Sequence, residues 1–147
     1  MTDQIILFET AKLAREKGFT ELCYASYHPK TKKLENTLSY SENILDRNDV
    51  EYIDEISITD SISYNSTDST RYDAPTQSLL QRWLREKHNI FVAVTFNNHT
   101  LKYYYFIFTN IKEQFSNRIC SLPLQFRFYE EALERALIEG LKLIDNV

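Results

Sequence analysis

The segment that decides the fold is Tyr72-Asp-Ala-Pro-Thr-Gln-Ser-Leu-Leu-Gln-Arg-Trp-Leu-Arg-Glu-Lys-His-Asn-Ile90. Pro75 suits the first turn of a helix, where the N–H group that proline lacks would have no helical partner, and Asp73 or Ala74 stands at or beside the cap. Asn89 suits the left-handed conformation that ends many helices. Between them, the apolar residues that share one helical face are Leu79, Leu80, Trp83 and Leu84. The segment therefore predicts a helix over about 75–88 that leads into a strand.

A β-hairpin is predicted directly after this helix. Residues 90–96 and 101–109 are rich in β-branched and aromatic side chains, and Asn97-Asn-His-Thr100 between them has the composition of a turn. Large side chains occupy both alternating sets of positions in the second strand. We therefore expect other parts of the protein to cover both faces of that strand at least partly, as they do for a central strand.

Two further helices and an earlier pair of strands are predicted on either side. An apolar band predicts a first helix over about 3–17 that stops at Gly18, and a single apolar stripe predicts a last helix over about 129–145. Residues 21–27 favour a strand that pairs with residues 34–40. Weaker patterns suggest a strand around Ile56 to Ile62, an irregular stretch over 110–121 and an edge strand over 124–128.

Together these elements predict an α+β fold in a single domain over residues 1–147. An antiparallel or mixed sheet, formed by the N-terminal strands and the hairpin 90–109, carries the three helices packed on it. A chain of 147 residues has the usual size of one domain, and its contents of 43% apolar and 14% aromatic residues are sufficient for a core.

The start of the chain and its charge indicate where the protein acts. Met1-Thr-Asp-Gln-Ile-Ile-Leu-Phe-Glu has no basic leader, and its short apolar run does not fit a signal peptide or a membrane span. We expect a cytoplasmic protein without a membrane partner, in which Cys23 and Cys120 are buried thiols rather than a disulfide. The net charge is −4, and the segment 42–60 holds seven acidic residues against Arg47 alone. Nucleic acid is therefore not the favoured partner, because an acidic protein does not attract it at long range.

The sequence lacks the common motifs of nucleotide binding and hydrolysis. With Gly18 and Gly140 as its only glycines, the chain has no P-loop, no Rossmann motif and no nucleophile elbow. No two histidines have zinc-protease spacing, and the acids that follow Asp46 do not match a calcium loop. Cys23 and His28 are close in sequence, but strand alternation puts them on opposite faces. We expect no catalytic residue, metal ligand or cofactor, and a non-enzymatic protein is the favoured reading.

One local group of basic side chains is a candidate binding site. It lies at the end of the helix 75–88 and consists of Arg82, Arg85, Lys87 and His88. Beside an aromatic strand, such a group would form a surface on which unpaired bases stack next to positive charge; that strand carries Lys102, Tyr104, Phe106 and Phe108. A buried aromatic core and the preference of helix C-termini for basic residues explain the same pattern, and this interpretation is favoured.

The segment Ala74-Pro-Thr-Gln-Ser-Leu-Leu-Gln-Arg-Trp-Leu-Arg-Glu-Lys-His-Asn-Ile90 resembles one in small uncharacterised proteins encoded by phages, prophages and mobile elements of gut bacteria. Residues 8–19 and 129–144 resemble the first and last helices of those proteins. The resemblance departs over residues 36–70, and at Phe128, where those proteins place a small capping residue. Together with the lack of a catalytic constellation, the resemblance motivates the hypothesis of a small accessory or interaction protein with an unknown protein partner. The alternative hypothesis is a nucleic-acid-binding module that uses the basic face of the helix 75–88 and the aromatic hairpin.

Overall fold

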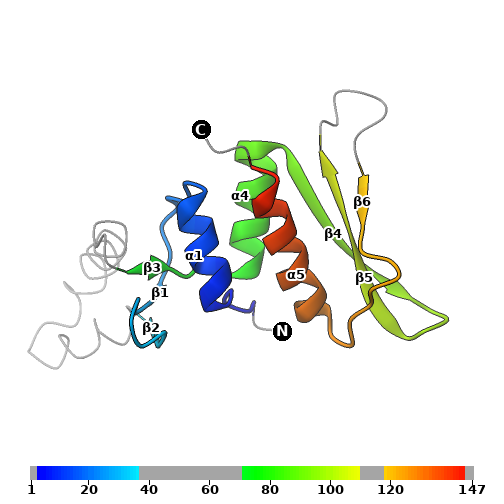
Figure 1. Ribbon diagram of the computed structural model, residues 1–147, viewed down its shortest axis with the longest axis horizontal. Helices are drawn as coiled ribbons and strands as arrows, with labels where there is room; N and C mark the ends of the chain where they lie inside the picture. Colours follow the sequence, from blue (N-terminus) through cyan, green and yellow to red (C-terminus); the bar gives the residue numbers. More distant parts are fainter. Residues whose placement is uncertain (1–2, 37–70, 110–117, 145–147) are drawn as a thin grey trace, which may run out of the picture. The chain divides into compact units, whose positions relative to one another are not determined.

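The computed structural model describes residues 3–36, 71–109 and 118–144, and the chain divides into two compact units. Unit 1 consists of Met1–Gln4 and Thr76–Val147, and unit 2 of Ile5–Pro75. Among the described residues, three helices and two three-stranded antiparallel sheets give the predicted α+β fold (Figure 1). The strands were expected in one sheet, but each unit has a sheet of its own. In each sheet, the two strands that pair with the central strand both belong to the same unit as that strand. The single domain over residues 1–147 stays a prediction.

Unit 2 combines one helix with a small sheet. The helix is α1 (Phe8–Glu16), and the sheet has the order β2 (Leu34–Asn36), β1 (Ala25–Tyr27), β3 (Tyr72–Asp73). β1 and β2 confirm the N-terminal hairpin in a shorter form. Gly18 has the left-handed conformation predicted for the end of the first helix, two residues after the last residue of α1: its φ is 89°, and the N–H of Phe19 donates to the carbonyl of Ala14 at 3.0 Å.

The prediction that the first helix begins near residue 3 is wrong. The carbonyl of Gln4 accepts the N–H of Gln77 at 2.7 Å, and the N–H of Ile6 donates to the carbonyl of Pro75 at 3.1 Å. Because these backbone groups are paired with a distant segment, residues 3–7 are not helical. The suggested strand at 56–62 and the acidic segment 42–60 lie outside the described residues.

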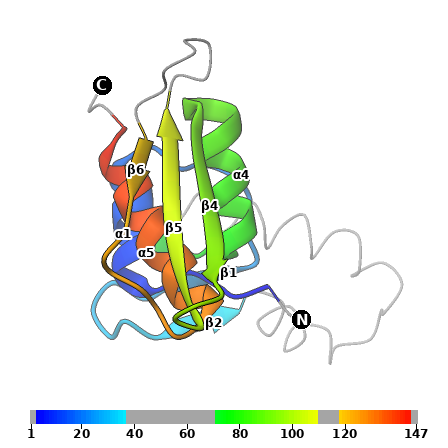
Figure 2. The ribbon, with the colours of Figure 1, turned by 90° about the vertical axis from the view of Figure 1, so that its right-hand side faces the viewer.

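Unit 1 packs two helices against one face of its sheet. The sheet has the order β4 (Ile90–Asn97), β5 (Lys102–Thr109), β6 (Arg118–Cys120), and α4 (Gln77–His88) and α5 (Tyr129–Lys142) lie behind it in Figure 2. β5 is the central strand, as predicted. An irregular stretch was expected over 110–121, but residues 118–120 form the strand β6. A strand of three residues is too short to show the alternation of side chains by which a strand is predicted. Residues 110–117 lie outside the described part of the chain.

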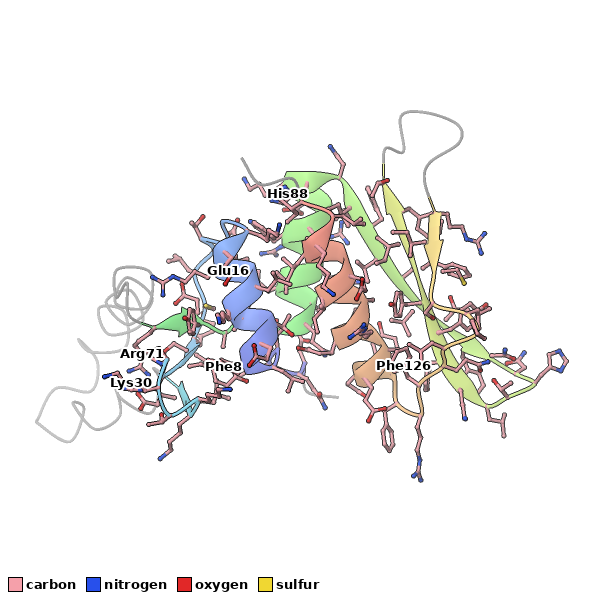
Figure 3. The ribbon with its side chains drawn as sticks, viewed as in Figure 1. Phe8, Glu16, Lys30, Arg71, His88 and Phe126 are labelled. Atoms are coloured by element: carbon pink, nitrogen blue, oxygen red, sulfur yellow. The ribbon has the colours of Figure 1, made fainter. Side chains whose placement is uncertain are left out.

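Two local details of unit 1 also differ from expectation. The N-cap of α4 is Thr76 rather than Asp73 or Ala74, and its hydroxyl oxygen accepts the N–H of Leu79 at 3.3 Å. The edge strand expected over 124–128 is reduced to one bridge, in which Phe126 and Tyr103 exchange two backbone hydrogen bonds of 2.7 Å (Phe126 is labelled in Figure 3). The end of α4 is as predicted, because Asn89 is left-handed with φ 54°.

The core of unit 1 lies between the sheet and its helices. The predicted stripe of the last helix is buried apart from the exposed Tyr129, and its buried members are Ala132, Leu133, Ala136, Leu137, Gly140, Leu141 and Ile144. A Cβ atom added to Gly140 would lie 3.3 Å from Cδ1 of Leu84 and 3.4 Å from Cγ2 of Val92. The missing side chain thus lets α5 approach α4 and β4 closely. Val92, the residue of β4 in these contacts, lies on the sheet face that packs against the two helices.

Candidate binding surface

Alternation along the strands gives the unit 1 sheet two different faces. The inner face packs on the helices and includes the buried Tyr105 and Ile107. The opposite set of residues is brought together by the strand register and is called the outer face: Phe91, Ala93, Thr95, Lys102, Tyr104, Phe106, Phe108, Arg118 and Cys120. Among the described residues of unit 1, no helix lies on this face (Figure 2).

Aromatic rings form a continuous row along the outer face of β5. The rings of Tyr104 and Phe106 meet edge to face with centroids 5.1 Å apart, and the centroids of Phe106 and Phe108 are 6.0 Å apart. Phe91 of β4 stands opposite Phe108 in the register. All four side chains are partly exposed. The outer face therefore presents aromatic surface that the helices of unit 1 leave uncovered.

Among the described residues, two basic side chains and no acidic one belong to the outer face. The guanidinium carbon of Arg118 lies 3.9 Å from the centroid of the Phe106 ring, an arrangement in which the cation is attracted to the face of the ring. Lys102 lies at the start of β5, and both basic residues are exposed. The outer face thus combines apolar rings with positive charge.

The basic residues predicted as a binding site do not join this surface. Arg82, Arg85 and Lys87 are exposed on α4, which packs on the inner side of the sheet. His88 meets the ring of Trp83 with centroids 4.5 Å apart, and burial lowers the pKa of His88. The two halves of the predicted platform, the α4 residues and the aromatic strand, therefore lie on opposite sides of the sheet. Binding by the four α4 residues stays a prediction.

Cys23 and His28 have features of structural rather than catalytic residues. Burial, with a smaller contribution from the carboxylate of Asp73, raises the pKa of Cys23 to about 12, so the thiol is protonated at neutral pH and a poor nucleophile. The Nδ1 atom of His28 accepts the backbone N–H groups of Lys30 and Thr31, each at 3.2 Å. His28 therefore stabilises the turn between β1 and β2.

Arg71 is an organising residue of unit 2 that the sequence did not reveal. Its Nε atom donates to Oγ of Ser26 at 2.8 Å, and its carbonyl accepts from the guanidinium of Arg15 at 2.7 Å. The hydrogen bond from Arg71 to the carboxyl group of Glu35 lowers the pKa of Glu35. Arg71, labelled in Figure 3, thereby links α1, β1 and β2. Its partners come from three separate segments, so no local pattern indicates them.

Three further searches for evidence on function gave no positive result. In the part of the chain that the structure describes, no group of three or more His, Cys, Asp or Glu side chains is placed to hold a metal ion. None of the described helices is both long and apolar enough to cross a membrane. Comparisons with known protein families, curated proteins and solved structures found no match to the chain. The outer face is therefore the main structural evidence on function.

Proposed function

We propose that this protein is a small, cytoplasmic, non-enzymatic accessory or interaction protein of phage or mobile-element type that binds its partner through the outer face. The observation that carries the proposal is the row of rings formed by Tyr104, Phe106 and Phe108 on the sheet face opposite the helices. Aromatic side chains dominate the energetics of binding surfaces, and rings held on a strand lose little freedom when a partner docks.

Two other observations support an accessory role. The resemblance of residues 74–90 to phage and prophage proteins motivates the assignment to that class. The thiol of Cys23, whose pKa is raised to about 12, lies in a protonated, buried position that is unsuited to nucleophilic attack.

A nucleic-acid-binding module is the second candidate function. The position of Arg118 over Phe106 favours it, because a guanidinium group beside exposed rings is a common arrangement where unpaired bases are bound. In this candidate the basic residues of α4 would be a separate contact region.

Cys120 allows a direct test of the outer face as the binding surface. It is exposed on this face, whereas Cys23 is buried, so a maleimide photo-crosslinker should attach selectively to Cys120. After illumination in a lysate of the producing organism, we expect a discrete crosslinked species that disappears in a labelled Phe106→Ala/Phe108→Ala variant. The control carries the same reagent on α4, as Glu86→Cys with Cys120→Ser. Capture from α4 alone, capture that ignores the ring substitutions, or the absence of any crosslinked protein or nucleic acid at Cys120 would refute the proposal.

A further inference from the structure

We infer that the partner of the outer face is single-stranded nucleic acid, with bases stacked on the rings of β5 and phosphates placed near Arg118 and Lys102. The inference rests on the proposed function, because it names the class of partner for the same surface. It differs from the sequence-based hypothesis in its location, since it requires no residue of α4.

The spacing and exposure of the rings suit an unpaired strand. Tyr104, Phe106 and Phe108 stand at alternate positions of β5, with neighbouring centroids 5.1 and 6.0 Å apart. Successive bases of a single strand can stack on the exposed rings or, at Phe106, on the guanidinium group of Arg118 that lies over that ring. This stacking tolerates any sequence because every base has a π-face. The bases of a duplex are already stacked on one another and do not offer these faces. The row therefore favours a single strand over a double helix.

The distribution of charge removes the main objection to nucleic acid. Unit 1 contains nine Lys and Arg residues against eight Asp and Glu, whereas unit 2 contains eight against thirteen. The net charge of −4 thus comes from unit 2 and not from the unit that carries the outer face. On the outer face itself, Lys102 and Arg118 are the only charged residues in the part of the chain that the structure describes. Local attraction of phosphates is therefore consistent with an acidic protein.

Arg118 is placed where it can contact both the bases and the phosphates of a nucleic acid. Its guanidinium group lies over Phe106, the middle ring of the row, with the carbon 3.9 Å from the ring centroid. A guanidinium plane stacks on bases and forms paired hydrogen bonds with phosphate. A positive charge at the centre of an aromatic surface thus matches both the bases and the phosphates of a nucleic acid.

Fluorescence anisotropy of the whole protein with labelled oligo(dT), oligo(U) and a duplex of the same length tests this inference. We expect single strands to bind more tightly than the duplex and all binding to weaken as salt is raised. Phe106→Leu/Phe108→Leu retains apolar side chains but removes both rings, and it should lower affinity about tenfold or more. Phe106→Ala/Phe108→Ala should bind at least as weakly. Arg118→Ala should lower affinity and reduce the salt dependence, and Arg118→Lys should be intermediate.

Matched controls separate the possible outcomes. Leu122→Ala/Leu124→Ala changes two exposed apolar residues outside the outer face and should bind as the parent protein does. Circular dichroism checks that each variant is folded. A loss confined to Arg82→Ala/Arg85→Ala/Lys87→Ala would overturn the inference, as would an absence of binding to every oligonucleotide. If oligonucleotides do not bind, but photo-crosslinking from Cys120 still yields a protein adduct that nuclease treatment does not remove, the inference fails and the proposed function stands. If neither occurs, both fail.

Discussion

The guanidinium group of Arg118 and the ring of Phe106 lie in direct contact on the outer face, where Arg118 is exposed and Phe106 is partly buried. Because such an exposed cation–π contact contributes about 0.5–1 kcal/mol, Arg118→Ala should lower the free energy of unfolding by no more than about 1 kcal/mol. Urea denaturation measures this change, with Lys102→Ala as the control for loss of an exposed charge. A much larger loss would show that Arg118 supports the core, and its effect on binding would then not report recognition.

The two cysteines should differ sharply in reactivity toward a thiol reagent such as DTNB. Cys120 is exposed, whereas Cys23 is buried and its pKa is raised to about 12. Only thiolates react rapidly, so one thiol per chain should react in the native protein at about pH 8, and two should react after denaturation. Cys120→Ser should abolish the rapid phase. If that variant keeps it, the described burial of Cys23 is incorrect.

Cys23 should also make stability depend on alkaline pH. The thiol has a pKa of 9.0 without the fold, and burial, followed by the charge of Asp73, raises the pKa to about 12. Because the folded pKa is the higher one, the contribution of Cys23 is complete below pH 9 and is lost as the pH rises toward 12. Urea denaturation at a series of pH values should show a decline of up to about 1.4 kcal/mol per pH unit. The decline should be less steep in Cys23→Ala, and identical slopes would argue against this assignment.

Signals between residues close in sequence predicted the helices and the main hairpin well. The stripe of α5, the left-handed Asn89 and the left-handed Gly18 each depend on a few neighbouring residues, and the structure confirms all three. The start of α1 was mispredicted because the backbone of residues 4–6 pairs with residues 75–77. An apolar band cannot reveal such pairing, since the partner lies far along the chain.

The outer face was predictable only in part, for a related reason. The alternation of Tyr104, Phe106 and Phe108 along one strand is visible in the sequence. Phe91 and Arg118 join them only through the register of β4 and β6 with β5. The sequence pattern of α4 shows which side of the helix is buried, but not which side of the sheet buries it. The basic residues of α4 were therefore grouped with rings that lie on the opposite side.

Thr76 should contribute measurably to stability as the cap of α4. Its hydroxyl oxygen accepts the N–H of Leu79, a group that has no partner within the helix. Thr76→Ala should lower the free energy of unfolding by about 1 kcal/mol, whereas Thr76→Ser keeps the oxygen and should stay within about 0.5 kcal/mol of the parent protein. Urea denaturation measures both values, and amide exchange at Leu79 should accelerate in the alanine variant alone. Equal losses in the two variants would exclude the capping role.

Gly140 should tolerate alanine but not leucine. A Cβ atom there would lie 3.3 Å from Cδ1 of Leu84, the movable end of a side chain, and the helix propensity of alanine adds up to about 1 kcal/mol. Gly140→Ala should therefore be close to neutral. A longer side chain would have to displace Val92 and Ile90 of β4 as well, so Gly140→Leu should cost about 1–3 kcal/mol or more.

Lys142→Leu is the matched control for the Gly140 substitutions, because it places the same side chain at an exposed position of α5 and should change stability by less than about 0.5 kcal/mol. Urea denaturation of the four proteins gives the comparison. The expected order of stability has Gly140→Leu lowest and the other three close together. If Gly140→Leu instead unfolds together with the control, α5 does not approach α4 and β4 at this residue, and the sheet is held against its helices by other contacts.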